Sequence, residues 1–328
     1  MTSSFENIVS RSPANPILKP MVRHPWESYA AFNWCPIRRG KTTSVVYRAM
    51  GARQRFGRST FHSSTIGCAE ILNGVVSGRR QLIVPKFPWE QYGCEDPRVT
   101  KLDGKYYIFY TALANYPPRA KDIRVAVAVT NDFHEISERH RVTPFNAKAM
   151  TLFPERIRGK MVVLFTLHSD RLPSSLALAE CTNEEDLWSE VFWRRWYAHR
   201  SSYLLNPRRA SDDHIEVGTP PLKIREGWLC FYAHIEKYGR QRYSPNRKFG
   251  IEAILLDHRN PQRIIARTTR SLISVVAPYE RKGNVRDVVF PSGALRRGKT
   301  VELFYGAGDR TGCLATISLP KLLRALDI

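Results

Sequence analysis

The sequence lacks any apolar run that could cross a membrane, and it lacks the features of a secreted protein. A membrane-spanning helix needs about 20 consecutive apolar residues. The first 18 residues contain Glu6, Arg11 and two prolines, whereas a signal peptide needs a continuous apolar stretch. These absences predict a cytoplasmic protein with no membrane partner.

Cysteines are also few and far apart, at positions 35, 68, 94, 181, 230 and 313. They form no Cys-x-x-Cys pair, and no cluster of cysteines and histidines has the spacing of a zinc site. We therefore expect no disulfide framework, no metal and no organic cofactor. Apolar residues make up 43% of the chain and charged residues 25%, which excludes a disordered or low-complexity protein.

Acidic residues are outnumbered, because 51 Lys and Arg face 30 Asp and Glu and give a formal charge of +21. Such a charge attracts phosphate, anionic sugars or nucleic acid. The basic residues are scattered as short pairs, without the long basic run or interleaved aromatics of a single-strand binding platform. We therefore expect no nucleic-acid partner, while an oligomer remains possible.

One local pattern occurs five times: a charged residue, a glycine, then Lys or Trp and an apolar run that ends in an aromatic residue. Its glycines are Gly40, Gly104, Gly159, Gly227 and Gly298. A charged residue followed by glycine suits a tight turn that needs a positive φ, and the apolar run suits a strand. Each copy therefore predicts a β-hairpin.

A proline precedes each of these glycines by four to seven residues, at positions 36, 97, 154, 221 and 291. Proline is confined to the beginning or the edge of a strand, so each unit is predicted to open at its proline. Five such sheets around an axis form an all-β, five-bladed β-propeller. We expect one catalytic domain over residues 1–328, with an N-terminal arm over about 1–30 and a short helix over about 320–326. Two stacked β-sandwiches are the alternative.

Polar residues beside the five prolines are predicted to converge at one mouth of the propeller, because the innermost strand comes first in each blade. They are Asn33, Glu95, Asp96, Arg98, Glu155, Arg156, Thr219, Lys223, Asp287 and Ser292. Carboxylates and cations that converge on a hollow fit acid–base chemistry on a polar ligand.

The segment Gly93-Cys94-Glu95-Asp96-Pro97-Arg98-Val99, followed by Asp103-Gly104-Lys105-Tyr106-Tyr107, resembles the signature of glycoside hydrolase family 130. This family comprises β-mannoside phosphorylases and mannosidases. Further matching segments follow the family's order along nearly the whole chain: Asn15–Leu18, Tyr47–Ala49, Leu152–Glu155, Pro220–Lys223, Leu255–Asp257, Val289–Gly293 and Tyr305–Asp309. The resemblance implies a five-bladed propeller that cleaves β-mannosides in mannose-containing oligosaccharides with inversion.

The resemblance also implies roles for single residues. Asp96 would be the general acid, acting through a hydroxyl of the mannose ring, and Arg98 would orient it. The other substrate-binding residues would be Arg48, Glu95, Glu155, Lys223 and Asp309.

Three departures from the phosphorylase pattern favour water as the attacking group. The chain reads Tyr232-Ala233-His234 where phosphorylases read Tyr-His-Gly. It also reads Lys148-Ala149 where the family has Lys-Asp, and Leu167-His168-Ser169 where phosphorylases read His-Arg-Pro. Hydrolysis with inversion needs a second carboxylate as general base. Glu252 and Glu236 are the candidates.

Two alternatives stay open at this point. The surplus of arginine could rebuild a site for inorganic phosphate as co-substrate, through Arg124, His234, Arg240 or Arg242, and the enzyme would then release mannose 1-phosphate. The chain could also be a non-catalytic propeller that binds glycans, which would not need a carboxylate such as Asp96.

Overall fold

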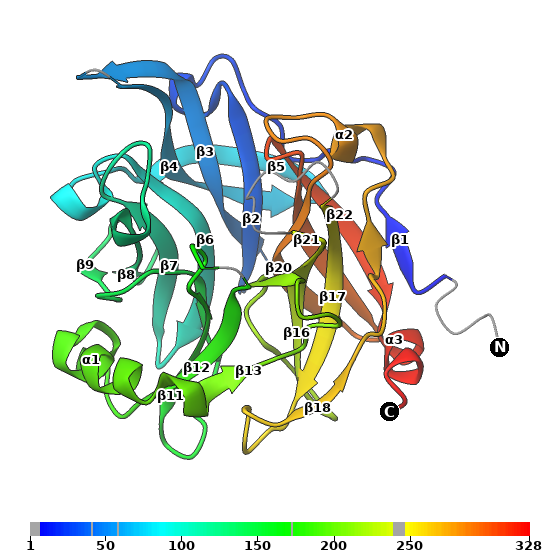
Figure 1. The fold of residues 1–328 in the computed structure, drawn as a ribbon. Helices are drawn as coiled ribbons and strands as arrows, with labels where there is room; N and C mark the ends of the chain where they lie inside the picture. The colour runs from blue at the N-terminus through cyan, green and yellow to red at the C-terminus, as the bar shows by residue number, and fades with distance from the viewer. Residues whose placement is uncertain (1–6, 41, 58, 172, 239–246) are drawn as a thin grey trace.

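The computed structural model describes residues 7–40, 42–57, 59–171, 173–238 and 247–328. In this part of the chain, antiparallel groups of strands stand around a common axis (Figure 1), and single parallel bridges, Ala31 to Thr311 and Ser64 to Gly93, join three of these groups into one 12-stranded sheet. The prediction of a five-bladed β-propeller is confirmed. No helix among these residues is long and apolar enough to cross a membrane.

The blades follow one another along the chain. Blade 1 contains β2 (Ala30–Arg39), β3 (Thr42–Phe56), β4 (Ser59–Leu72) and β5 (Val75–Ile83). Blade 2 contains β6 (Gly93–Leu102), β7 (Lys105–Leu113), β8 (Ile123–Thr130) and β9 (Glu138–Arg141). Blade 3 contains β10 (Ala147–Leu152), β11 (Met161–Leu167), β12 (Ser175–Cys181) and β13 (Leu204–Leu205).

Blade 4 contains β14 (His214–Val217), β15 (Leu222–Ile224), β16 (Gly227–Glu236), β17 (Lys248–Leu256), β18 (Ile264–Arg267) and β19 (Ile273–Ser274). Blade 5 contains β20 (Val289–Arg297), β21 (Thr300–Ala307), β22 (Thr311–Ser318) and, from the other end of the chain, β1 (Val9–Arg11). The helices are α1 (Glu190–Ala198), α2 (Pro278–Arg281), α3 (Leu319–Ala325) and the short 3₁₀ helices η1 (Pro25–Glu27), η2 (Pro88–Glu90), η3 (Ala120–Asp122), η4 (Glu185–Trp188) and η5 (Arg200–Tyr203).

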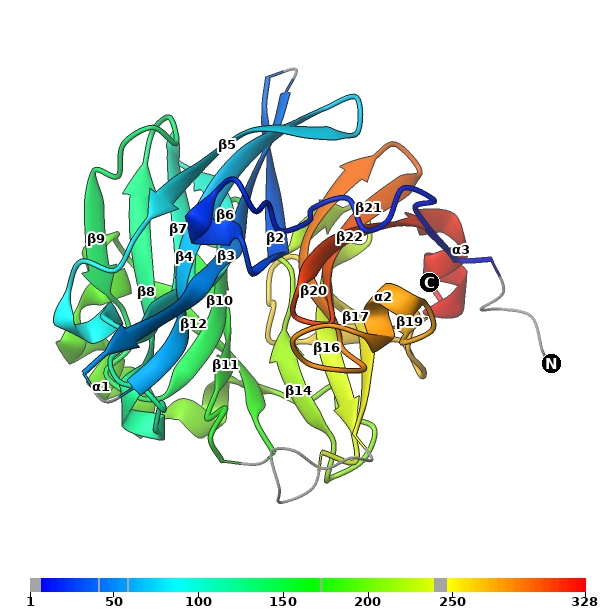
Figure 2. The same ribbon diagram turned by 90° about the horizontal axis from the view of Figure 1, so that it is seen from above.

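Four of the five glycines lie where the sequence places them, between the inner strand and the next strand of a blade, and Gly227 is instead the first residue of β16. Gly40, Gly104, Gly159 and Gly298 have φ between 60° and 86°, a conformation that glycine adopts without strain. In Figure 2 the turns of blades 1 and 5 project at the top of the molecule, which is one end of the propeller axis.

The prolines do not open the units as predicted. Pro36, Pro97 and Pro291 lie inside β2, β6 and β20, and each is next to a β-bulge. A bulge interrupts the ladder, so a residue without an N–H costs little there. Pro154 follows β10, and Pro221 directly precedes β15.

The two ends of the chain meet in blade 5. Strand β1 pairs antiparallel with β22, Val9 opposite Ile317 and Arg11 opposite Ala315, so part of the N-terminal arm becomes the outer strand of the blade (Figure 1). Helix α3 spans Leu319–Ala325, next to this strand. The pairing closes the ring with strands from both ends of the chain.

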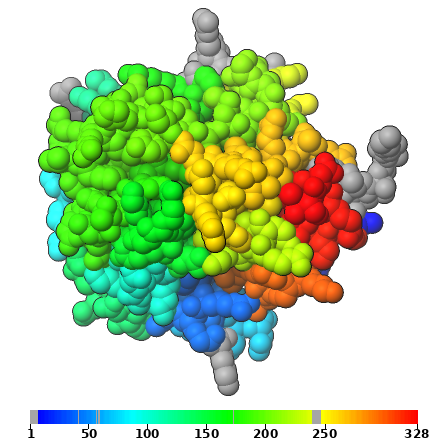
Figure 3. Space-filling model, turned by 90° about the horizontal axis from the view of Figure 1, so that it is seen from below, coloured from blue at the N-terminus to red at the C-terminus, as the bar shows by residue number. Residues whose placement is uncertain are grey.

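The hydrophobic core lies between neighbouring blades. Leu229 and Phe231 of blade 4, for example, belong to the same buried cluster as Leu303 and Tyr305 of blade 5. Every residue of β11 is buried, as expected for a strand that is covered on both faces. Figure 3 shows blades 3 (green) and 4 (yellow) in close contact at the surface.

Four blades also share a buried carboxylate that accepts a hydrogen bond from a tyrosine hydroxyl and lies beside an arginine. We call these Tyr–Glu–Arg units: Tyr47–Glu27–Arg79, Tyr110–Glu90–Arg139, Tyr232–Glu252–Arg209 and Tyr305–Glu280–Arg11. All four glutamates have 0% exposure. In blade 3 the tyrosine is replaced by Phe165. Because buried charges need partners, these units tie loops to strands.

Candidate active site

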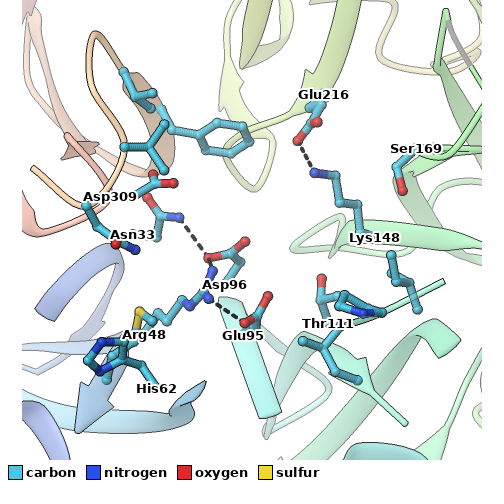
Figure 4. A pocket seen from close by; sticks show the side chains of 18 of the residues that line it. Asn33, Arg48, His62, Glu95, Asp96, Thr111, Lys148, Ser169, Glu216 and Asp309 are labelled. Atoms are coloured by element: carbon cyan, nitrogen blue, oxygen red, sulfur yellow. Dashed lines mark hydrogen bonds and ion pairs between the residues drawn. The ribbon is translucent and has the colours of Figure 1, made fainter. Parts of the chain in front are cut away.

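A cavity of about 480 Å³ lies at the end of the axis opposite the glycine turns, and all five blades contribute to its lining. Asn33 comes from blade 1, Asp96 from blade 2, Lys148 from blade 3, Glu216 from blade 4 and Asp309 from blade 5 (Figure 4). This volume is typical of a site for a small molecule.

The bulges of the inner strands bring polar side chains to this cavity. Asn33, Asp96 and Ala149 occupy the bulges of β2, β6 and β10, with φ of 48°, 52° and 50°. A bulge re-aims a side chain, and Asn and Asp tolerate this left-handed conformation better than most residues. Ala149 has the same backbone but no polar group to present.

Asp96 is held by two neighbours. Asn33 Nδ2 donates a hydrogen bond of 2.7 Å to Asp96 Oδ1, and Arg48 Nη1 lies 3.5 Å from the same oxygen (Figure 4). Arg48 also donates to Glu95, which accepts a further hydrogen bond from Ser64. The Asp96 side chain remains 20% exposed, so it is fixed in position and still accessible to a ligand.

Asp309 faces the same group of charges from blade 5. Burial, opposed by Arg48 and assisted by Asp96, raises the pKa of Asp309 to about 6. Burial also raises the pKa of Glu95, although Arg48 opposes it. Asp309 can therefore exchange a proton near neutral pH.

A second charged group stands across the cavity from Asp309 and Asn33 (Figure 4). Lys148 Nζ lies 2.7 Å from Glu216 Oε2, and His214 Nε2 lies 2.9 Å from the other carboxylate oxygen. Burial by itself would raise the pKa of Glu216, but Lys148 and His214 outweigh it and lower the pKa to about 2. Glu216 is thus an ionised carboxylate whose charge offsets that of Lys148.

Four of the expected site residues, Arg48, Glu95, Asp96 and Asp309, line this cavity together. Arg98 does not. It has 0% exposure and donates to backbone carbonyls of Asp96, Pro97, Gly218 and Pro291, not to the Asp96 carboxylate. Arg98 thereby joins backbone segments of blades 2, 4 and 5.

Glu155 and Lys223 lie away from the cavity. They form an ion pair, about half exposed on each side, beside the glycine turns of blades 3 and 4. A separate cavity there also includes Arg156 and Arg158. The expectation that both residues contact the substrate at Asp96 is not met, because they lie at the opposite ends of their blades.

The two candidate bases also lie outside the cavity lining. Glu252 belongs to the Tyr–Glu–Arg unit of blade 4 and is fully buried. Its hydrogen bond from Tyr232 repeats the arrangement of Glu27, Glu90 and Glu280, which indicates a structural role. Glu236 forms an ion pair of 2.6 Å with Arg209 and lines a neighbouring cavity.

The proposed phosphate ligands that the structure describes do not form a cradle. His234 is buried beside Asp213, Arg209 and Glu252, and burial together with Arg209 lowers its pKa to about 4. Arg124 donates to the backbone carbonyls of Ala120 and Ile123. Arg240 and Arg242 lie outside the described residues.

Glu216 is a site residue that the sequence argument missed. It stands directly opposite Ala233 in the β14–β16 ladder, and opposite residues of two paired strands share a face. The departure at Ala233 was evident from the sequence, but its neighbour across the ladder was not. Lys148, noted only as part of a departure, and the aromatic residues Phe61, Tyr92 and Tyr116 also line the cavity.

Comparisons with known proteins show the family of the chain. The sequence model of a glycoside hydrolase family 130 group, described as beta-1,4-mannooligosaccharide phosphorylase, matches residues 9–327. The chain belongs to this family. The protein is therefore a glycoside-active enzyme, a glycosidase or a closely related phosphorylase.

Several relatives are similar over almost the whole chain. A 1,2-beta-oligomannan phosphorylase of Thermoanaerobacter is 27% identical over 94% of this chain and 96% of its own. The solved structure of a beta-1,2-mannobiose phosphorylase from Listeria innocua has a TM-score of 0.78, 20% identity and coverage of 97% and 99%. Another solved structure has a TM-score of 0.71, 19% identity and coverage of 94% and 93%. Its description states that this family of mannoside phosphorylases contains glycoside hydrolases that target β-1,2-mannosidic linkages in Candida mannan.

Proposed function

We propose that this enzyme cleaves β-mannosidic bonds in mannose-containing oligosaccharides with inversion, and that Asp96 supplies the proton to the leaving sugar. The observation that carries the proposal is the position of Asp96. A bulge aims it at the cavity, and Asn33 and Arg48 fix one of its oxygens. The family and the names of the relatives support a β-mannoside as substrate.

Inorganic phosphate is the first candidate for the attacking group. The curated relatives are named phosphorylases, so the preference for hydrolysis that the sequence suggested is not supported by them. Phosphorolysis would release mannose 1-phosphate, with phosphate placed across the sugar from Asp96.

Water is the second candidate, because the charges of the cavity are unfavourable for an anion. Among the described residues that line it, the carboxylates are Glu95, Asp96, Glu216 and Asp309, and the Lys and Arg side chains are Arg48, Lys148 and Arg247. Arg48 and Lys148 are each paired with carboxylates. Glu216 would then be the ionised group that receives the proton of the attacking water.

Product analysis tests the proposal and separates the two candidates. The enzyme is incubated with β-1,2- and β-1,4-mannobiose, with and without about 10 mM phosphate, and products are followed by proton NMR. Release of α-mannose 1-phosphate only with phosphate supports phosphorolysis, and release of α-mannose independent of phosphate supports hydrolysis. No cleavage of either sugar, or a first product of β configuration, would overturn the proposed reaction.

The variant Glu216→Gln sharpens the choice between phosphate and water. Removing the carboxylate charge leaves Lys148 able to attract an anion, and one charge-assisted contact is worth about 1.5–3 kcal/mol. We expect the ratio of phosphorolysis to hydrolysis to rise at least tenfold. Glu302→Gln, on the glycine-turn side of blade 5, is the control and should leave this ratio unchanged. An unchanged ratio in Glu216→Gln would show that the Lys148–Glu216 pair does not govern the acceptor.

A further inference from the structure

The lining of the cavity is partly charged and partly aromatic. Beside the charged residues described above, it includes the rings of Phe61, Tyr92 and Tyr116. We call these three residues the aromatic shelf. Phe61 comes from β4 of blade 1, and the two tyrosines flank the β6–β7 hairpin of blade 2.

The strand ladder of blade 2 connects the charged residues Glu95 and Asp96 to the aromatic shelf. Glu95 stands opposite Thr111 and Gly93 opposite Leu113, and the N–H of Tyr92 donates to the carbonyl of Leu113. Thr111 and Leu113 both line the cavity. Tyr92 is three residues from Glu95, so the shelf begins roughly 10 Å further along the strand direction.

The three rings of the shelf hold one another in place. The Phe61 and Tyr116 rings stack with centroids 4.9 Å apart and an interplanar angle of 24°, and the Phe61 and Tyr92 centroids are 5.3 Å apart. Phe61 is only 6% exposed, whereas Tyr116 is 39% exposed. Phe61 is therefore the packed centre, and Tyr116 is the more exposed ring.

Exposure indicates the direction in which a bound oligosaccharide would leave. The side chains of Glu95 and Asp96 are 16% and 20% exposed, whereas Tyr116 is 39% exposed, so a chain whose terminal mannose lies at Asp96 would pass out beside Tyr116. One face of a pyranose ring is made of C–H groups, which pack on the face of an aromatic ring. Tyrosine combines an apolar ring with a polar hydroxyl and suits such a half-wet site.

We propose that the aromatic shelf binds a sugar of the leaving chain beyond the one that flanks the cleaved bond. The enzyme then prefers oligosaccharides of three or more mannose units to the disaccharide. This inference rests on the proposed function, because it takes the position of Asp96 as the point of cleavage.

Binding to a protein that cannot turn over its ligand tests the shelf. In the Asp96→Asn background, calorimetry gives the affinity for mannotetraose and for mannobiose of the same linkage. Adding Tyr116→Ala should lower the ratio of the two affinities about two- to tenfold, since an aromatic contact of this kind is worth roughly 0.5–1.5 kcal/mol beyond its buried area. Tyr116→Phe keeps the ring and should keep most of the preference.

Tyr203→Ala is the matched control, because Tyr203 stacks on Trp196 at the rim of blade 3 and lines a different cavity. It should leave the ratio unchanged. An unchanged ratio in Tyr116→Ala, including equal losses of affinity for both sugars, would contradict a sugar-binding role of the aromatic shelf while leaving the proposed function intact. Failure of the Asp96→Asn protein to bind either sugar, together with no cleavage by the unmodified enzyme, would reject the proposed function and the shelf with it.

Discussion

Carboxylates occur in two settings in this propeller. Asp96, Glu95, Glu216 and Asp309 face the cavity at the end of the axis, while Glu27, Glu90, Glu252 and Glu280 are sealed inside the Tyr–Glu–Arg units. Both groups have arginine or lysine partners. The cavity carboxylates line a space that a ligand can enter, whereas the glutamates of the Tyr–Glu–Arg units are fully buried.

This difference separates a catalytic setting from a structural one. Glu252 and Glu216 lie on the same blade, but their pKa values are shifted in opposite directions. Burial, partly opposed by Arg209, raises the pKa of Glu252. Lys148 and His214 outweigh burial at Glu216 and lower its pKa to about 2. Residue type alone therefore does not reveal the role. The neighbours and the access to the cavity do.

The largest effect is expected from breaking a Tyr–Glu–Arg unit. Glu90→Gln leaves the nearly buried Arg139 without its charge partner and weakens the acceptor for Tyr110. Removing one member of a buried ion pair costs about 3–5 kcal/mol, so urea unfolding should show a loss of this size. Glu138→Gln is the control, since its side chain is 41% exposed and should cost under about 1 kcal/mol. A similar, small loss in both variants would show that the Tyr–Glu–Arg unit does not stabilise the fold.

A smaller change, this time a gain in the free energy of unfolding, is expected when a cavity carboxylate, Asp309, is removed. The pKa of Asp309 is about 6 in the folded protein and 3.8 in its model compound, so the folded state binds the proton more tightly. The free energy of unfolding therefore falls as pH rises from about 4 to 6, and this cost stays constant at higher pH. Asp309→Asn should remove it and stabilise the protein by about 1–2 kcal/mol at pH 8, after allowance for solvent screening.

Urea unfolding of Asp309→Asn and the unmodified protein at several pH values measures this gain. It should grow between pH 4 and pH 6. A loss of stability at pH 8 would show that the Asp309 carboxylate is satisfied as a structural group, like those of the Tyr–Glu–Arg units.

The smallest effect is expected at the bulge of β10. Ala149 has a φ of 50°, which costs an L-residue about 1–2 kcal/mol, whereas glycine adopts it freely. Ala149→Gly should stabilise the protein by about 0.5–1 kcal/mol after the entropy of the unfolded chain is included. Ala147→Gly, in the same strand, should instead destabilise it, and thermal unfolding distinguishes the two. Destabilisation in both variants would show that the bulge is not strained at Ala149.

The sequence predicted the architecture because the glycine turns are local. Gly40, Gly104, Gly159 and Gly298 mark hairpins through a backbone conformation that needs no knowledge of distant residues. The Asp96 segment was recognisable for the same reason. The bulge that aims Asp96 at the cavity was not predicted. Pro97 was expected to begin a strand, whereas it lies within β6.

The remaining site residues depend on contacts between segments far apart in the sequence. Lys148 meets Glu216, and Glu216 stands opposite Ala233. Glu252 was a candidate base as a carboxylate of the fourth unit, but its contacts with Tyr232 and Arg209 make it part of a Tyr–Glu–Arg unit. The repeated Pro-Trp-Glu and Pro-Tyr-Glu segments at 25–27, 88–90 and 278–280 were the available signal for such buried glutamates.

Parallel turnover assays of Asp96→Asn and Glu252→Gln test the central claim most directly. Both variants are assayed on β-mannobiose with phosphate present, and rates are expressed per folded molecule. The account predicts that Asp96→Asn loses about 10²–10⁴-fold in kcat, as expected for a general acid, and that Glu252→Gln stays within about threefold of the unmodified enzyme. Full activity in Asp96→Asn, or a loss of a hundredfold or more in Glu252→Gln, would contradict it.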